Sequence, residues 1–443
     1  MMGAAMDPRR NSDLDSALTE ARALYVAGRP NSAALHEKAS QVMPGGNTRS
    51  VLAYSPFPTA MARGEDCRLW DIDGREYLDL CGEYTAGLFG HSEPLIHDVL
   101  HATLKRGTNL AAVGEGEERL ARILCARFPS IERLRFTNSG TEANLMALTA
   151  ARAFTGRETI LAMRGGYHGG VLTFPLAGRS PVTLPLPFVL ADYNNLADAQ
   201  RVARENRADL AAIIVEPMLG GGGCIPADPA FLQGLRDLAT ETGAVLIFDE
   251  VMTSRMSGGG LQARLGITPD MTTLGKYIGG GMSFGAFGGG SAIMAQFDGK
   301  LPHAGTFNNN VLSMAAGATA MGTIFTPERA EALYQNGEAL RQRLNSLAEE
   351  AGVPMGFTGL GSMLTVQFRR PLPTAPFKPT PPEEGLRELF FFDMLASGVY
   401  LARRGMVAIS LPVGPAELDR FVAAVAEFIE TRAELLKAFG HAA

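Results

Sequence analysis

The fold of this chain is decided by the stretch Ala244-Val245-Leu246-Ile247-Phe248-Asp249-Glu250, an apolar run that ends in two carboxylates. Such a run is typical of a central parallel strand whose carboxyl end opens on a site. In open α/β sheets, ligands bind at that edge. A lysine follows in Thr273-Leu274-Gly275-Lys276-Tyr277. Together the two segments offer an acid that can hold a cationic ring and an amine that can form an imine.

Composition narrows the class of protein. The chain has 443 residues, 46% hydrophobic and 19% charged, so it can bury a large core and is too long for one compact unit. A net charge of -6 and scattered basic residues give no footprint for nucleic acid or an anionic membrane. Residues 1–14 lack the apolar segment of a secretory signal, and no apolar segment is long enough to span a bilayer. We therefore expect a cytoplasmic protein without nucleic-acid or membrane partners.

Neither the cysteines nor the histidines indicate a metal site. The cysteines lie far apart and form no Cys-x-x-Cys pair: Cys67, Cys81, Cys125 and Cys224. His36-Glu37 begins a His-Glu-x-x-His motif, but Ser40 stands where the second histidine is needed. We expect no bound metal and no disulfide framework.

The rest of the chain alternates between strand and helix patterns. An Asp-Gly turn at Asp73-Gly74 predicts a β-hairpin over 69–79. Other strands are predicted at 133–137, 159–163, 211–215, 363–368 and 407–411. Helices are predicted at 13–28, 32–41, 94–106, 115–128, from 138 onward, 231–242, 311–325, 328–351 and 415–437. The alternation indicates the α/β class with a doubly wound sheet.

Loops and boundaries follow from glycine and proline. The glycine-rich stretch 279–290 and residues 304–310 are expected to be loops around the site, and 371–382 an exposed connection. We divide the chain into an N-terminal segment, 1–80, a large domain, 81–326, and a C-terminal domain, 327–443.

Polar groups follow two further strands. Asn138-Ser139-Gly140-Thr141-Glu142 opens a helix, and Ser139 with Glu142 fits a capping box. The same N–H groups, glycine and hydroxyls also suit a phosphate, and the motif alone leaves both interpretations open. Beyond the strand at 159–163, a glycine loop presents Tyr167 and His168, and the strand at 211–215 ends at Glu216.

Three arginines lie on predicted loops: Arg49, Arg403 and Arg404. A loop arginine can act as a bidentate receptor for a carboxylate. Because most arginines are exposed surface charges, the residue pattern alone favours that simpler interpretation.

These parts together point to one cofactor. Pyridoxal phosphate needs an acid for its pyridine nitrogen, a lysine for its aldehyde, a stacking face for its ring and an anion site for its phosphate. Lys276 would hold the cofactor and, once freed, would move the proton as general base and acid. Asp249 would keep the pyridine nitrogen protonated.

The chain resembles the class III (subgroup II) pyridoxal-phosphate aminotransferases of fold type I. The resemblance covers nearly the whole chain and rests on 138–144 (NSGTEAN), Tyr167-His168-Gly169, Glu216-Pro217, 249–255 (DEVMTSR) and 273–276 (TLGK). It implies a large domain with a mostly parallel sheet flanked by helices, plus a smaller α+β domain built from the N- and C-terminal segments. It also implies a homodimer with shared active sites.

The resemblance assigns roles to individual residues. It implies that the cofactor is held by Ser139, Gly140 and Thr141 at the phosphate, Tyr167 on the ring, Asp249 at the pyridine nitrogen and Lys276 as the Schiff-base lysine, with His168, Glu216, Val251 and Met252 beside them, and Thr306 reaching the phosphate across a dimer interface. The substrate-binding residues would be Arg49, Tyr84 and Arg404.

Within the family, the resemblance is closer to the aromatic β-amino acid (β-phenylalanine) aminotransferases than to glutamate semialdehyde aminomutase. The matching segments are 44–51 (PGGNTRSV), 83–87 (EYTAG), 305–310 (GTFNNN) and Arg404-Gly405. The implied reaction moves the amino group of a β-amino acid to a keto acid such as 2-oxoglutarate or pyruvate. Arg49 would receive the substrate carboxylate, which a β-amino acid holds one carbon further from its amine. Arg404 would bind the acceptor's α-carboxylate, although the sequence does not decide between Arg403 and Arg404.

Several alternatives stay open or are disfavoured. An aminomutase or another ω-aminotransferase is the main rival. A non-catalytic pyridoxal-binding regulator would need an appended DNA-binding helix-turn-helix, which the acidic chain does not indicate. A nicotinamide enzyme would need Gly-x-Gly-x-x-Gly between an early strand and helix. A serine hydrolase fails because Ile293 stands where the elbow after Ser291 needs glycine.

Overall fold

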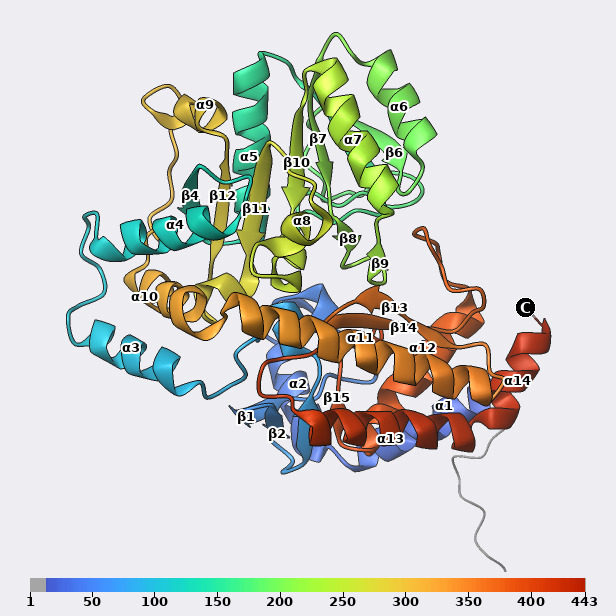
Figure 1. Cartoon of the computed structure of the whole chain (residues 1–443). Helices are drawn as coiled ribbons and strands as arrows, with labels where there is room; N and C mark the ends of the chain where they lie inside the picture. The colour runs from blue at the N-terminus through green and yellow to red at the C-terminus, as the bar shows by residue number, and fades with distance from the viewer. Residues whose placement is uncertain (1–12, 443) are drawn as a thin grey trace, which may run out of the picture.

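The computed structural model describes residues 13–442 and is organised around one large sheet and two smaller ones (Figure 1). In Figure 1 the large sheet and its helices form the upper half, and elements from both ends of the chain lie together below it. None of the helices described in this range is both long enough and apolar enough to cross a membrane.

The large sheet has seven strands in the order β4-β12-β11-β10-β7-β5-β6. Their bounds are β4 Arg133–Thr137, β5 Thr159–Arg164, β6 Phe188–Asp192, β7 Leu210–Val215, β10 Val245–Asp249, β11 Met271–Gly275 and β12 Gly285–Gly289. Strand β12 runs opposite to the other six strands, so the sheet is mostly parallel, as predicted. Strand β10, which contains the apolar run that ends in Asp249, lies at its centre.

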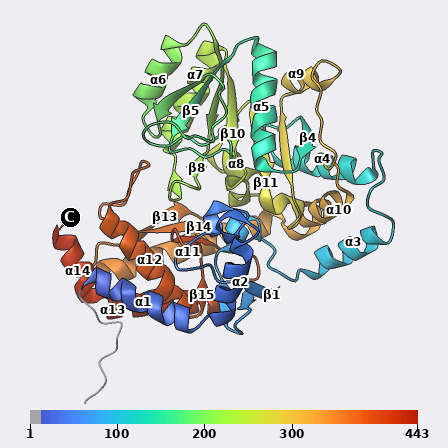
Figure 2. The same ribbon diagram turned by 180° about the vertical axis from the view of Figure 1, so that it is seen from behind.

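Strand β10 is buried on both faces, which explains its unbroken apolar run. Val245 and Ile247 belong to the hydrophobic cluster under α5 (Gly140–Thr155), while Leu246 and Phe248 belong to the cluster under α6 (Leu196–Glu205) and α7 (Pro229–Thr242). Successive side chains of a strand point to opposite faces, so two helical layers need apolar residues at every position. The turned view shows α5 on one side and α6 and α7 on the other (Figure 2).

The remaining helices cover the sheet edge and build the lower half. Their bounds are α1 Leu14–Ala27, α2 Pro30–Ser40, α3 Pro94–Leu104, α4 Glu115–Arg127, α8 Gly260–Leu265, α9 Ser291–Met294, α10 Val311–Thr319, α11 Pro327–Glu350, α12 Pro381–Ala396, α13 Pro415–Thr431 and α14 Ala433–Ala442. The small-sheet strands are β1 Met61–Glu65, β2 Arg68–Asp71, β3 Glu76–Asp79 and β15 Val399–Tyr400 in one sheet, β13 Gly356–Leu360, β14 Met363–Gln367 and β16 Met406–Ala408 in another, and β8 Met218–Leu219 with β9 Ile225–Pro226 in a two-stranded pair.

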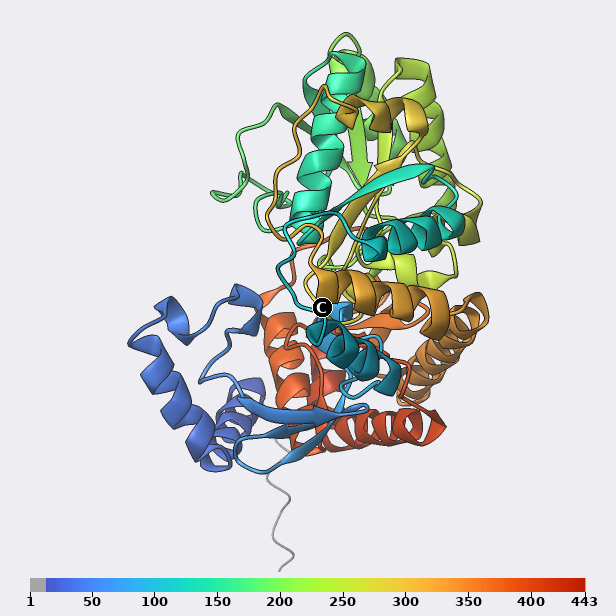
Figure 3. The same cartoon turned by 90° about the vertical axis from the view of Figure 1, so that its left-hand side faces the viewer.

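The two ends of the chain pack on each other. Strand β3 pairs in parallel with β15, with Leu78 opposite Val399, and α1 packs against α12 through rings such as Tyr25 and Phe392. Figure 3 shows the N-terminal elements in the same lower layer as the C-terminal helices. The predicted hairpin over 69–79 is confirmed as β2 and β3.

Two sequence expectations are wrong. Residues 285–289 of the glycine-rich stretch form the internal strand β12 instead of a loop. A side chain there would collide with the neighbouring strands, because a Cβ on Gly285 would lie 2.2 Å from the Ser139 carbonyl oxygen, and one on Gly289 would lie 2.5 Å from that of Asp270. These glycines therefore allow close packing of backbone within a sheet.

The second error concerns the C-terminal helix, expected to continue from 415 to 437. It ends at Thr431 and restarts at Ala433, with Arg432 between the two helices. The Arg432 side chain is buried and forms an ion pair with Asp393 of α12, with Nε 2.9 Å from Oδ2. The helix therefore breaks at the residue that pairs with a carboxylate distant in the sequence. The spacing of apolar residues along 415–437 does not show this pairing.

Candidate active site

A cavity of about 370 Å³ lies where β4, β7, β10 and β11 end. It brings together twelve predicted site residues: Arg49, Tyr84, Ser139, Gly140, Thr141, Tyr167, His168, Glu216, Asp249, Val251, Met252 and Lys276. Parallel strands place their carboxyl ends at one edge of the sheet, which explains how segments more than two hundred residues apart meet there.

Asp249 is held in a fixed orientation at the end of β10. Its Oδ2 lies 2.8 Å from His168 Nδ1 and accepts a hydrogen bond of 2.8 Å from Asn144 Nδ2, while Oδ1 accepts one of 3.0 Å from the Val251 N–H. His168 is 1% exposed and contacts the carboxylate of Asp249. These three contacts therefore fix the orientation of the Asp249 carboxylate.

Sequence reasoning assigned no role to Asn144, which belongs to the quoted 138–144 motif. Its Oδ1 also accepts a hydrogen bond of 2.7 Å from Thr273 Oγ1, so it links the end of β10 to β11. The available signal was its position five residues after the helix cap Ser139, on the face of α5 that packs on the sheet.

Lys276 directly follows β11 and lines the same cavity as Asp249. Its backbone has a φ of 55°, a left-handed conformation that is unfavourable for a residue with a side chain. Burial, and next the positive charge of Arg404, lower the pKa of the Lys276 amine to about 8. A larger fraction of this amine is therefore neutral near neutral pH than for an exposed lysine, and the neutral form is the nucleophile.

The N-terminus of α5 forms a narrow cradle. Ser139 caps the helix by accepting a hydrogen bond of 3.2 Å from the Glu142 N–H, and Glu142 accepts one of 2.9 Å from the Asn138 N–H. A Cβ on Gly140 would lie 2.8 Å from a methyl group of Val251, so only glycine fits. The first-turn N–H groups and the helix dipole favour an anion here.

Glu216 fastens the loop that carries Tyr167. Its two oxygens accept hydrogen bonds from the N–H groups of Tyr167, at 2.9 Å, and Gly220, at 3.0 Å. Burial raises the pKa of Glu216 to about 7. Tyr167 itself is half exposed in the cavity wall, where its ring is free to stack on a planar group.

The two candidate receptor arginines both lie near the ring of Tyr84, although only Arg49 lines the cavity. The guanidinium carbon of Arg49 is 5.7 Å from the Tyr84 ring centre, and that of Arg404 is 5.5 Å from it. Arg403 instead forms an ion pair with Glu388 of α12, at 2.7 Å. Of Arg403 and Arg404, it is therefore Arg404 that lies near the Tyr84 ring, and its positive charge helps to lower the pKa of Lys276.

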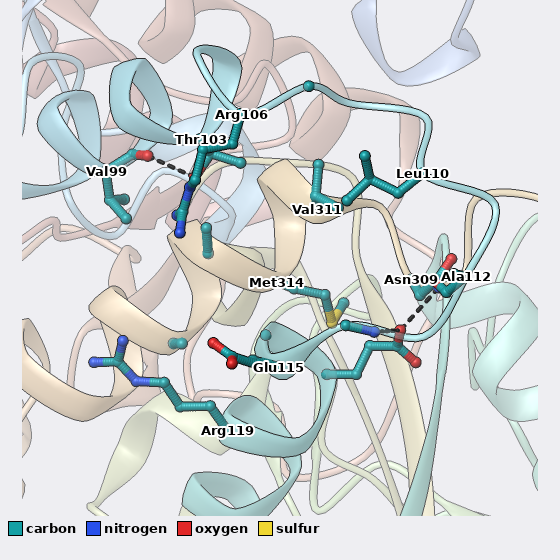
Figure 4. A pocket seen from close by; sticks show the side chains of 16 residues that line it. Val99, Thr103, Arg106, Leu110, Ala112, Glu115, Arg119, Asn309, Val311 and Met314 are labelled. Atoms are coloured by element: carbon teal, nitrogen blue, oxygen red, sulfur yellow. Dashed lines mark hydrogen bonds between the residues drawn. The ribbon is translucent and has the colours of Figure 1, made fainter.

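Thr306 does not line this cavity. Its loop, 305–310, lies beside a second, mostly apolar hollow of about 300 Å³ between α3, α4 and α10, with Asn309 and Val311 in the wall (Figure 4). Nearby side chains leave more than half of their surface exposed: Leu104, Leu110, Val113 and Phe307.

The cavity residues fit pyridoxal phosphate. A buried carboxylate, Asp249, a half-buried lysine, Lys276, the half-exposed ring of Tyr167 and the helix N-terminus at Gly140 line one cavity. Among residues 13–442, no group of three or more His, Cys, Asp and Glu side chains is placed to hold a metal ion.

Comparison with known proteins gives a consistent result. The family model for class-III aminotransferases matches residues 51–415. The chain is 50% identical over 426 residues to the β-phenylalanine transaminase of Variovorax paradoxus, covering 96% of this chain and 98% of that one. It is 36% identical to a glutamate-1-semialdehyde 2,1-aminomutase of Desulfitobacterium hafniense, covering 91% and 97%.

A solved structure agrees. The crystal structure of a β-phenylalanine aminotransferase from Variovorax paradoxus superposes with a TM-score of 0.94 at 50% identity, covering 96% of this chain and 99% of that one. Fold and sequence therefore agree over nearly the whole chain. This chain belongs to the class-III aminotransferases, a family of fold type I enzymes that use pyridoxal 5′-phosphate.

Proposed function

We propose that this enzyme moves the amino group of an aromatic β-amino acid, similar to β-phenylalanine, to a keto acid such as 2-oxoglutarate or pyruvate. The observation that carries the proposal is Arg49, a cation in the wall of the cavity that holds Lys276. A carboxylate one carbon further from the amine needs a receptor displaced from the α-position. The similarity to a β-phenylalanine transaminase supports the same substrate class.

When bound, pyridoxal phosphate supplies the electron sink for the reaction. Ser139, Gly140 and Thr141 would bind its phosphate, Tyr167 would stack on its ring, and Asp249 would pair with its pyridine nitrogen. Lys276 Nζ would take the proton from the donor carbon that carries the amino group and pass it on within the same half of the cycle, and in the other half it would deliver a proton to the keto-acid carbon that receives the amino group. His168 and Glu216 would act through Asp249 and Tyr167, the groups they hold.

The arginines would share the two carboxylate substrates. Arg49 would bind the carboxylate of the β-amino acid, and Arg404 the α-carboxylate of the keto acid, with the Tyr84 ring near both. Both roles use the planar guanidinium, which forms paired hydrogen bonds with a carboxylate.

Replacing Arg49 with alanine is expected to lower kcat/KM for 3-amino-3-phenylpropanoate about 10- to 150-fold, the range for losing a hydrogen bond to a charged group. Turnover of 1-phenylethylamine, which has no carboxylate, should change far less. Steady-state kinetics with both donors gives the comparison. Arg63→Ala is a matched control, because Arg63 is also an exposed arginine paired with a glutamate, but outside the cavity. Equal losses for the two donors would remove this role from Arg49.

The aminomutase alternative is distinguished by the acceptor. An intramolecular mutase turns over without an added keto acid, whereas a transaminase without one stops after the first half of its cycle, when each active site has accepted one amino group. A panel of amine donors with pyruvate, with 2-oxoglutarate and with neither separates the two reactions and identifies the preferred acceptor. The cytoplasmic location stays a prediction.

We also propose a homodimer in which a second copy of this chain covers the apolar hollow of Figure 4 and brings Thr306 to its partner's phosphate cradle. The exposed apolar side chains and the 305–310 loop at the same surface support this arrangement.

Light scattering should give about twice the chain mass of 47.1 kDa. Val113→Glu, which adds a charge to the apolar surface, should shift the mass toward one chain. Val182→Glu, at another exposed valine that lies away from this hollow, should not. A monomeric mass for the unchanged chain would contradict the proposal.

A further inference from the structure

Arg49 already has a carboxylate partner within the chain. Its Nη1 lies 2.7 Å from Glu83 Oε1, and both side chains line the cavity that holds Lys276. Glu83 also lines an adjoining hollow of about 300 Å³, so its side chain stands where the two spaces meet. The arginine proposed to receive the substrate is therefore occupied by an acid of the enzyme itself.

An unusual backbone conformation places Glu83 there. Residues 82–85 all have positive φ: 51° at Gly82, 46° at Glu83, 54° at Tyr84 and 82° at Thr85. Only the first is glycine, and left-handed turns are unfavourable for other residues because Cβ crowds the following carbonyl oxygen. Hydrogen bonds hold the turn at both ends, from Gly82 N–H to Asp79 Oδ1 at 3.0 Å and from Gly87 N–H to the Gly82 carbonyl at 2.8 Å. Local strain of this kind persists where the surroundings over-determine it.

Tyr84 joins this turn to the Arg49 loop. Its hydroxyl donates a hydrogen bond of 3.0 Å to the Val51 carbonyl oxygen, two residues beyond Arg49. The turn and the loop thus keep a fixed relation, and Glu83 stays within reach of the guanidinium.

The other candidate receptor differs. No ion pair joins Arg404 to a carboxylate within residues 13–442, and its Nε is buried without a hydrogen-bond partner in that range. One arginine at Tyr84 therefore carries an internal carboxylate, while the other has none.

We propose that Glu83 is a specificity-determining residue, an internal carboxylate that occupies Arg49 until the substrate carboxylate replaces it. The inference rests on the proposed role of Arg49. The Arg49 and Glu83 side chains are 43% and 58% exposed, and an exposed ion pair changes an equilibrium by at most about fivefold. A substrate carboxylate can therefore displace Glu83 readily, and Glu83 weakens the binding of every carboxylate that competes for Arg49.

The test uses the holoenzyme and 3-phenylpropanoate, a carboxylate that has no amine and cannot react. In E83Q, calorimetry should show its Kd lowered about 2- to 5-fold, the range open to an exposed ion pair. The KM for 3-amino-3-phenylpropanoate should fall by the same factor with kcat unchanged, and the KM for 1-phenylethylamine should not move. Glutamine keeps the size of the side chain and leaves the backbone strain as it was.

Two controls separate a direct contact from a general change of charge. E93Q removes a carboxylate from the wall of the adjoining hollow, where Glu93 caps α3 and pairs with no arginine in the described chain. It should leave the Kd of 3-phenylpropanoate unchanged. Combined with Arg49→Ala, E83Q should lose its effect.

An unchanged Kd in E83Q, or equal tightening in E93Q, would overturn the role of Glu83 and leave Arg49 as receptor. If Arg49→Ala alone leaves the Kd of 3-phenylpropanoate unchanged, Arg49 is not the receptor, and the proposed substrate site fails together with this inference.

Discussion

Lys276→Ala is expected to lower kcat at least ~10⁴-fold, because the variant loses both the amine that binds the cofactor covalently and the general base that moves the proton. Lys276 lines the same cavity as Asp249, and its lowered pKa of about 8 leaves a usable neutral fraction of the amine at physiological pH. Kinetics with 3-amino-3-phenylpropanoate and 2-oxoglutarate measures the loss. The visible absorbance of the lysine-bound cofactor should also disappear. After treatment with borohydride, the variant should hold no covalently attached cofactor, whereas the unchanged enzyme should.

Lys300→Ala is the control, since Lys300 is exposed and does not line the cavity. It should keep the activity and the absorbance of the unchanged enzyme. Mass spectrometry after borohydride treatment should locate the cofactor on the peptide that contains Lys276. A cofactor still attached to the protein in Lys276→Ala would contradict the assignment of this lysine.

Asp249→Asn is expected to lower kcat about 10²- to 10³-fold, the usual loss when one preorganised electrostatic group is removed from a site. Asparagine has nearly the same shape but no charge, so it cannot hold a pyridine nitrogen in its protonated form. In the unchanged chain, the two Asp249 oxygens accept hydrogen bonds from Asn144 and from the Val251 N–H. Asparagine replaces one of these oxygens with an NH₂ group, which cannot accept a hydrogen bond. Kinetics and a pH titration of the visible absorbance report the two consequences separately.

Asp192→Asn is the matched control for Asp249. Asp192 also ends a strand of the large sheet, β6, but it is exposed and pairs with Arg164. It should leave kcat and the absorbance titration unchanged. Retained activity in Asp249→Asn would mean that the buried carboxylate has a structural role only, and the roles proposed for its neighbours would have to be revised.

The large sheet was the most predictable part of the molecule. Strand β10 shows an unbroken apolar run because helices cover both of its faces, and this local pattern is visible without any structure. The strand ends at Asp249, Glu216 and Thr137 meet at one edge because parallel strands share a direction. The motifs also identified the family correctly.

The errors have a common cause. Glycines at 285–289 read as a loop by residue type, but they form a strand because neighbouring backbone comes too close for any side chain. Arg432 lies in the middle of a helical pattern, yet the helix breaks there, where its side chain pairs with Asp393 of α12. In both cases the local conformation goes with a contact to a residue that is distant in the sequence.

The sequence by itself determined the parallel sheet, the acid and the lysine at its edge, and the family, since burial on two faces and short motifs are local properties of the chain. Only the tertiary structure decided which side chains meet. It pairs Arg403 with Glu388, leaves Arg404 beside Tyr84, holds Asp249 through His168 and Asn144, and places Glu83 on Arg49. Partners of this kind come from separate elements, and their choice depends on how those elements pack, which the periodicity of a single segment does not contain.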